Sequence, residues 1–139
     1  MNNLILIRHG QSLWNKERRF TGWADVNLTK KGMEEAKYAG NLIKKLEINF
    51  NAYFTSAQQR AINTLNIILE VLNKKNALVQ KTYKLNERHY GSLTGLNKDE
   101  MMKKHGDKQI HAWRRSYDIP PPPMELSSPY HPSKNKAYK

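Results

Sequence analysis

The prediction of the fold starts from the stretch "LILIRHG", Leu4 to Gly10. Four consecutive apolar residues run directly into an arginine, a histidine and a glycine, without the alternation typical of a half-exposed strand. A short continuous apolar run predicts a strand that is buried on both faces, as in a parallel sheet. Because the basic pair follows at once, we expect Arg8 and His9 to stand at the carboxyl end of a rigid strand.

The next part of the chain alternates between helical and strand patterns. Thr29 is a candidate N-cap of a helix that runs to about residue 47, and Ser56, followed three residues later by a glutamine, predicts a capping box for a second helix. Short strands are predicted at 52–56 and 77–80. The order strand, helix, strand, helix, strand favours right-handed crossovers, so we expect an α/β fold with a mostly parallel sheet.

The remaining chain changes character at residue 119. Asn97 predicts the N-cap of a short helix over 98–104, and another helical piece is expected near 107–115. Beyond them a run of four prolines leads into a polar stretch with almost no apolar periodicity, which predicts a loop or a disordered tail. We expect residues 1–118 to form one portion of a single domain and residues 119–139 to be a Pro-rich loop or tail.

Composition restricts the kinds of partner. The 139 residues contain 24 Lys and Arg against 12 Asp and Glu, a formal net charge of +12, which favours an anionic partner. The absence of cysteine excludes disulfides and thiolate metal sites. No apolar run approaches the ~20 residues of a membrane helix. We therefore expect a cytoplasmic protein.

Residues with reactive or charged side chains follow each of the three predicted strands, and ligands of open α/β sheets bind beyond the carboxyl ends of the strands. Arg8 and His9 follow the first strand, Arg60 follows the second and Glu87 follows the third. Imidazole is a nucleophile near neutral pH, guanidinium groups bind phosphate, and a carboxyl group can move protons. The pattern indicates phosphoryl transfer through histidine, although a single histidine after a strand is more often structural and Glu87 alone is more often a surface carboxylate.

Five segments carry a resemblance to a known family: "LIRHGQSLWN", "FTGWADVNLTKKGMEEA", "TSAQQRAINTL", "KLNERHYGSLTGLNK" and "WRRSYDIPPPP". The first is similar to the Arg-His-Gly signature of the histidine phosphatase superfamily. The others resemble the cofactor-dependent phosphoglycerate mutases within that superfamily. The resemblance implies a three-layer α/β/α fold with a mostly parallel sheet. It also implies interconversion of 3-phosphoglycerate and 2-phosphoglycerate through a phosphohistidine primed by 2,3-bisphosphoglycerate, without a metal.

The same resemblance implies roles for individual residues. His9 would be the phosphohistidine, and Glu87 would be the proton donor and acceptor. The residues that would bind phosphate or substrate are Arg8, Asn15, Thr21, Gly22, Arg60, Arg88, Tyr90, Lys98, Arg114 and Arg115. The implied partners are small-molecule phosphoglycerates, with no nucleic acid and no membrane, and related mutases suggest a homodimer.

The sequence departs from the family pattern in one respect. The family places a second catalytic histidine in a His-Gly-Asn segment far downstream, and the 139 residues contain no such segment. We therefore expect a chain in which the C-terminal part of the domain is missing, with weak or absent mutase activity, because one electrostatic donor at the reacting group contributes typically ~10²–10³ in rate. A phosphatase of the same superfamily, a non-catalytic fragment and, more remotely, a basic nucleic-acid-binding module stay open as alternatives.

Overall fold

A computed structural model describes residues 3–138 of the chain. These residues form two compact units. Unit 1 is made of residues 3–13 and 26–85, and unit 2 is made of residues 14–25 and 86–138. The expected division of the chain at residues 118 and 119 stays a prediction.

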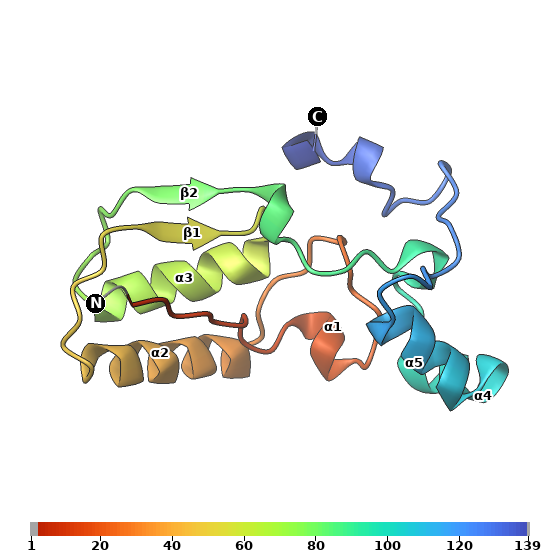
Figure 1. Ribbon diagram of the computed structural model, residues 1–139, viewed down its shortest axis with the longest axis horizontal. Coiled ribbons are helices and arrows are strands. Elements are labelled where there is room, and N and C mark those ends of the chain that lie inside the picture. Colours follow the sequence, from red (N-terminus) through yellow and green to blue (C-terminus); the bar gives the residue numbers. More distant parts are fainter. Residues whose placement is uncertain (1–2, 139) are drawn as a thin grey trace. The chain divides into compact units, whose positions relative to one another are not determined.

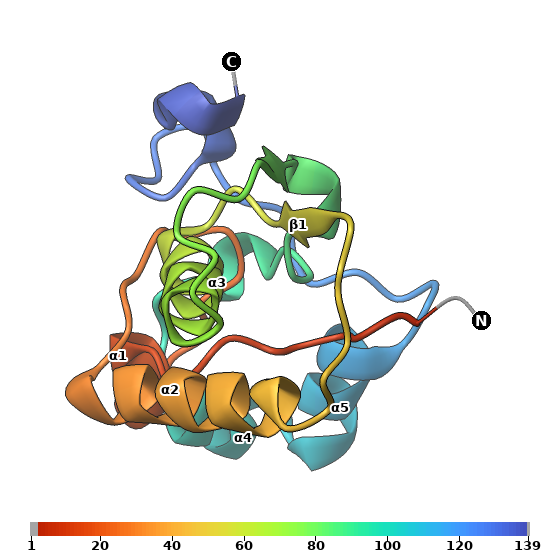
Figure 2. The same ribbon diagram turned by 90° about the vertical axis from the view of Figure 1, so that its left-hand side faces the viewer.

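Unit 1 has an α/β architecture. It contains α2 (Lys30–Lys44), β1 (Tyr53–Thr55), α3 (Gln59–Val71) and β2 (Val79–Lys81), followed by a 3₁₀ turn, Tyr83–Leu85. β1 and β2 pair in parallel, and α3 lies between the two strands and α2 (Figure 1; Figure 2). The α/β class, the parallel pairing and these two predicted strands are confirmed.

Helix α2 begins where the sequence predicts it. The Thr29 hydroxyl oxygen accepts a hydrogen bond from the Gly32 N–H at 3.1 Å, so it satisfies one of the donors that a helix leaves open at its N-terminus. Further along, Ala36 and Gly40 are buried. A Cβ atom at Gly40 would lie 3.0 Å from the Val71 Cβ, so the missing side chain lets α2 approach α3 closely.

Removal of this cap tests how much it stabilises unit 1. Thr29→Ala is expected to lower the free energy of unfolding by about 1 kcal/mol, the usual contribution of an N-cap side chain. Thr29→Ser keeps the hydroxyl and serves as the matched control, with a much smaller loss. Urea titrations followed by circular dichroism measure both variants. Equal losses in the two variants would show that the methyl group, not the cap, carries the effect.

Helix α3 begins two residues later than predicted, so the capping box at Ser56 is wrong. Its N-cap is Gln58, which makes no side-chain cap hydrogen bond. The Ser56 hydroxyl accepts from the Gln58 N–H at 3.3 Å and closes a turn ahead of the helix. Ser56 therefore forms a turn that precedes the helix and does not cap it.

The predicted strand over Leu4–Ile7 is also wrong in this structure. Within residues 3–138 this segment belongs to no strand, and Leu4 and Leu6 are 81% and 85% exposed. A strand requires a neighbour that pairs with its N–H and C=O groups. In the described part of the chain, β1 and β2 pair only with each other, so the N-terminal segment has no such neighbour.

Unit 2 is built mainly from short helices. After α1 (Leu13–Lys16) come a 3₁₀ turn, Gly91–Leu93, then α4 (Lys98–His105) and α5 (Asp107–Arg115). The predicted N-cap at Asn97 is confirmed, because its side chain accepts from the N–H groups of the second and third residues of α4. The core of unit 2 consists of Phe20, Leu93 and Ile110, with Tyr90, Met101, Met102 and Trp113 packed against it.

The chain beyond residue 119 is irregular but makes defined contacts within unit 2. It contains 3₁₀ turns at Pro132–Lys134 and Lys136–Tyr138. The Tyr130 ring packs edge-on against Trp14, with 5.2 Å between the ring centroids. Side-chain packing, not regular secondary structure, therefore holds this segment.

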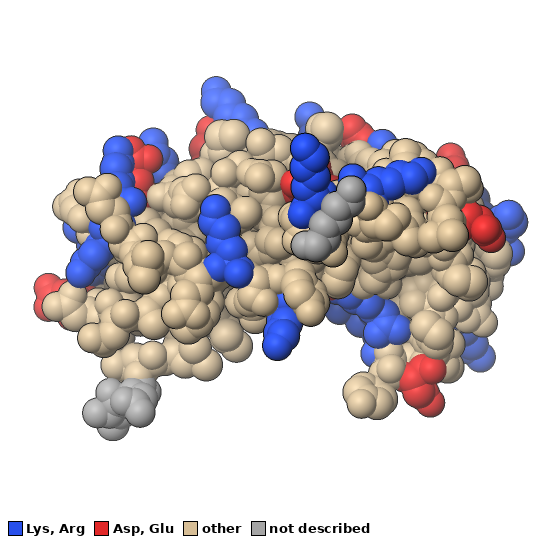
Figure 3. Space-filling view, turned by 90° about the horizontal axis from the view of Figure 1, so that it is seen from above, with Lys and Arg blue, Asp and Glu red and all other residues tan. Residues whose placement is uncertain are grey.

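Two further properties concern membrane crossing and the distribution of charge on the surface. None of the helices formed by residues 3–138 combines the length and the apolar character that crossing a membrane requires. In Figure 3 the Lys and Arg side chains of the visible face stand singly or in small groups among uncharged residues.

Candidate active site

The imidazole of His9 has a defined tautomer. Its Nδ1 lies 2.7 Å from the carbonyl oxygen of Gly10. A carbonyl oxygen only accepts hydrogen bonds, so Nδ1 carries the proton. In the neutral ring the lone pair is therefore on Nε2, which is the nitrogen available as a nucleophile.

Arg60 lies directly against this nitrogen. Its Nε–H donates to His9 Nε2 at 3.3 Å, and the Arg60 side chain is fully buried. Arg60 sits in the first turn of α3, directly after β1, as the sequence predicts. A buried guanidinium next to the nucleophile supplies positive charge where the oxygens of an incoming phosphoryl group would gather. The structure thus brings His9 and Arg60 together, and their roles at a phosphoryl group stay predictions.

Backbone contacts fix the turn that carries His9. The Gly10 N–H donates to the Thr64 hydroxyl at 3.1 Å, and that hydroxyl donates to the Arg60 carbonyl oxygen at 2.8 Å. On the other side, a Cβ at Gly10 would collide with the carbonyl oxygen of Gly32 in α2. The turn after His9 therefore fits only because residue 10 has no side chain.

The remaining predicted residue of unit 1, Arg8, is exposed. It precedes His9 in the chain, and its side chain is not locked by an ion pair among those of residues 3–138 that the structure defines. An exposed arginine is free to adjust to a bound anion, at a cost in side-chain entropy.

In unit 2, Glu87 is half-buried and its backbone is held by Trp23. The Trp23 Nε1–H donates to the Glu87 carbonyl oxygen at 2.8 Å. The same indole ring packs against Tyr138, with 4.8 Å between the centroids, and edge-on against His89. Trp23 therefore anchors the backbone at Glu87.

Arg88 is fixed by backbone carbonyl groups. Its guanidinium donates to the carbonyl oxygens of Ser116 at 2.8 Å and Ile119 at 3.0 Å. The Nε–H groups of Arg88 and Arg114 are buried, and residues 3–138 offer neither of them a hydrogen-bond acceptor. A buried donor without an acceptor is costly, so these two groups mark a place where an anion would be favourable.

The other residues implied by the resemblance lie in unit 2 as well. Thr21 and Gly22 are buried, and Gly22 has a φ of 52°, a conformation that glycine adopts without strain. The Tyr90 ring packs on the Phe20 ring, with 5.1 Å between the ring centroids. Lys98 Nζ lies 5.9 Å from the Phe20 ring centroid. Asn15 is half-buried in α1, and α5 carries Arg114, half-buried, and Arg115, exposed.

His89 is the histidine whose titration the fold changes. Its Nδ1 accepts from the Gly91 N–H at 3.0 Å, which leaves the proton on Nε2, a buried donor without an acceptor in the described part of the chain. Burial lowers the pKa of His89 below its ordinary value of 6.5, and the nearby His131 lowers it further.

The lowered pKa of His89 makes the stability of the chain depend on pH. Because the folded state binds this proton less readily than the unfolded state, the contribution of neutral His89 is present above pH 6.5 and is lost as the pH falls through the folded-state pKa. The free energy of unfolding is therefore expected to fall as the pH drops below 6.5 towards the lower folded-state pKa. His89→Gln should flatten this dependence, and His111→Gln, at an exposed position of α5, is the control. An unchanged slope in His89→Gln would contradict the assignment.

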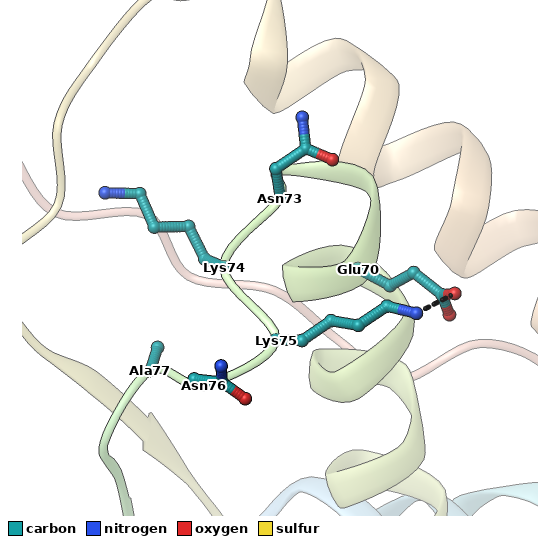
Figure 4. Close-up of a pocket in the computed structure, with 6 residues that line it drawn as sticks. All are labelled: Glu70, Asn73, Lys74, Lys75, Asn76 and Ala77. Carbon is teal, nitrogen blue, oxygen red and sulfur yellow. Dashed lines mark ion pairs between the residues drawn. The ribbon is translucent and has the colours of Figure 1, made fainter.

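A separate pocket of about 490 Å³ lies at the far end of α3 (Figure 4). It is lined by Glu70, Asn73, Lys74, Lys75, Asn76 and Ala77, and Lys75 Nζ pairs with Glu70 at 2.7 Å. Ten helical residues separate Glu70 from Arg60, which corresponds to roughly 15 Å along the axis. This pocket is therefore distinct from the surroundings of His9.

No metal centre accompanies these residues. Within residues 3–138 no group of three or more His, Cys, Asp and Glu side chains is placed to hold a metal ion.

Two residues of the site were not identified as functional from the sequence: Thr64, and Trp23 in its contact with Glu87. Thr64 follows Arg60 by four positions, so both lie on one face of α3, and that spacing was the available signal. It did not suffice, because a threonine in a helix gives no sign of which backbone group its hydroxyl will reach.

The chain is similar to known phosphoglycerate mutases and to a solved structure described as a hydrolase. A curated relative from Porphyromonas gingivalis, named 2,3-bisphosphoglycerate-dependent phosphoglycerate mutase, is 54% identical over 139 residues, which are 100% of this chain and 56% of the relative. A solved phosphoglycerate mutase from Bacillus anthracis is 30% identical, with a TM-score of 0.65 over 76% of this chain and 47% of its own. A solved structure described as mycobacterial hydrolase 1 is 25% identical, with a TM-score of 0.69 over 81% of this chain and 50% of its own.

The chain thus spans about half the length of the relatives that it matches. The family model described as histidine phosphatase superfamily (branch 1) matches residues 4–130. That match includes His9 and Arg60. The chain therefore belongs to the histidine phosphatase superfamily, branch 1.

Proposed function

We propose that the chain takes part in the interconversion of 3-phosphoglycerate and 2-phosphoglycerate through a phosphohistidine at His9, primed by 2,3-bisphosphoglycerate. The observation that carries the proposal is the position of His9, whose Nε2 faces the buried Arg60 while its Nδ1 proton is held by the Gly10 carbonyl. The 54% identity to a relative named for this reaction supports it.

The first step would be a transfer of one phosphoryl group to His9. The Nε2 lone pair forms a bond to phosphorus as the bond between phosphorus and the ester oxygen of the bisphosphoglycerate breaks. Glu87 would give a proton to the departing oxygen and take it back when the group returns to the other hydroxyl. Arg60 and Arg8 would hold the oxygens of the phosphoryl group during both transfers.

The substrate would be held by side chains of unit 2, among them Asn15 of α1. The buried Nε–H groups of Arg88 and Arg114 support this role, because an anionic ligand would supply the acceptors that they otherwise lack. The full proposed set is Asn15, Thr21, Gly22, Arg88, Tyr90, Lys98, Arg114 and Arg115.

Phosphohistidine formation tests the proposal on residues that this chain contains. The purified chain is incubated with 2,3-bisphosphoglycerate, and its intact mass is followed over time. We expect the mass to rise by one phosphoryl group. When the phosphorylated chain, freed of reagent, receives 3-phosphoglycerate, the phosphoryl group should pass to it as 2,3-bisphosphoglycerate, and 2-phosphoglycerate should appear as His9 takes up the other phosphoryl group of that bisphosphoglycerate. A mass that never changes would instead favour a non-catalytic chain.

A phosphatase of the same superfamily is the second candidate. It is favoured by one observation, the likeness to a solved structure described as a hydrolase at 25% identity. Water would then accept the phosphoryl group from His9 in place of a phosphoglycerate hydroxyl. The products distinguish the two, because the phosphatase releases inorganic phosphate and the mutase forms 2-phosphoglycerate without phosphate release.

Three further properties belong to this proposal: a cytoplasmic location, a homodimer, and small phosphoglycerates as the ligands in place of nucleic acid or membrane. Light scattering of the purified chain measures the oligomeric state. Binding to nucleic acid that weakens steeply with salt would revive the remote alternative of a nucleic-acid-binding module.

A further inference from the structure

We infer that Thr64 is a positioning residue for the nucleophile, an inference that rests on the proposed function of His9. The Thr64 side chain is 4% exposed and lies in α3. Its hydroxyl accepts from the Gly10 N–H at 3.1 Å and donates to the Arg60 carbonyl oxygen at 2.8 Å. One hydroxyl thus joins the residue after the nucleophile to the residue that would bind its phosphoryl group.

The bond from the Thr64 hydroxyl to the Arg60 carbonyl oxygen is a common one in helices. The bond from the Gly10 N–H to the Thr64 hydroxyl is a contact between distant parts of the sequence. A serine or threonine in a helix often donates to the carbonyl oxygen four residues earlier, as Thr64 does to Arg60. That bond aims the hydroxyl, since it uses the single proton and leaves the oxygen lone pairs directed away from the helix. The bond from Gly10 joins two residues that are 54 positions apart in the sequence, and it is buried.

The bond from Gly10 acts on His9 through the backbone. The Gly10 N–H belongs to the peptide group between His9 and Gly10, so Thr64 fixes that peptide. The Gly10 carbonyl belongs to the following peptide group and accepts from His9 Nδ1. Thr64 therefore sets the orientation of the segment that, in turn, holds the Nδ1 proton and directs Nε2 at Arg60.

Thr64→Val tests this role, because valine keeps the shape of threonine and removes the hydroxyl. Misplacement of a reacting group by about 1 Å can cost ~10² in rate. We expect the rate constant for phosphorylation of His9 by 2,3-bisphosphoglycerate to fall by roughly ten- to a hundredfold, with a small change in the concentration of half-saturation. Thr64→Ser restores the hydroxyl and should recover most of the rate.

Asn66→Ala, at an exposed position of the same helix, is the matched control and should leave the rate unchanged. A valine variant that is phosphorylated as fast as the unchanged chain would overturn the inference. So would a serine variant that is as slow as the valine variant, because the loss would then follow from packing.

A second measurement separates this inference from the proposed function and does not depend on the valine variant folding. Amide hydrogen exchange of the unchanged chain, followed by NMR, should show the Gly10 N–H protected. Thr64→Ser should keep that protection. An unprotected Gly10 amide would overturn the positioning role even if His9 is phosphorylated. A protected amide in a chain that takes up no phosphoryl group would leave the bond in place and count against the proposed function alone.

Discussion

Replacing His9 by alanine is expected to reduce phosphoryl uptake from 2,3-bisphosphoglycerate to the background of the reagents. The imidazole supplies the bond-forming lone pair at Nε2, and alanine has no group that could replace it. A half-buried side chain at the end of an exposed segment contributes little to the core, so the variant should unfold at nearly the same urea concentration as the unchanged chain. Intact mass spectrometry measures the uptake.

His111→Ala is the matched control for this experiment, because His111 is exposed and lies in α5 of unit 2. It should be phosphorylated as fast as the unchanged chain. Uptake that persists in His9→Ala and disappears in His111→Ala would place the nucleophile in unit 2 and refute the assignment of His9.

Arg60→Ala is expected to slow phosphorylation of His9 by roughly 10²–10³-fold, the usual effect of removing one electrostatic donor from a reacting group. The same change should destabilise unit 1, because Arg60 is fully buried and alanine leaves a cavity. Arg60→Lys keeps the charge but loses the planar pair of donors, so it should recover part of the rate. Rapid-quench kinetics measure the rates.

Arg18→Ala is the control for charge. Arg18 is an exposed arginine that pairs with Asp99 at 2.7 Å, and its removal lowers the net charge by the same amount as Arg60→Ala. Its rate should not change. If both variants were slowed equally, general electrostatic attraction of the ligand would explain the effect, and the specific contact between Arg60 and His9 would not.

The sequence was sufficient for two helix starts that are set by local contacts, but not for α3, where the local pattern placed the N-cap at Ser56 instead of Gln58. Thr29 and Asn97 cap α2 and α4 through their own side chains, and both caps were predicted because the geometry involves only a few neighbouring residues. The strand over Leu4–Ile7 was not correctly predicted. Strand formation depends on a distant partner, and no pattern within the segment reveals whether that partner is present.

The candidate site likewise has one part that the sequence predicted and one part that it did not. The contact between His9 and Arg60 was predicted, but for a reason that is partly wrong, because the strand expected before His9 does not form within residues 3–138. The role of Thr64 was not, because the Gly10 N–H that it binds is far away in sequence. The contact of Trp23 with the Glu87 carbonyl was not predicted either, because a tryptophan in a loop does not indicate which acceptor its N–H will reach.

The central claim is that the phosphoryl group is carried by Nε2 of His9. NMR of the chain labelled with nitrogen isotopes at histidine, after reaction with 2,3-bisphosphoglycerate, tests it most directly. The hydrogen bond from Nδ1 to the Gly10 carbonyl predicts a phosphorus coupling to Nε2 of His9, with the proton retained on Nδ1. A phosphoryl group on Nδ1 of His9, or on any other residue, would contradict the account.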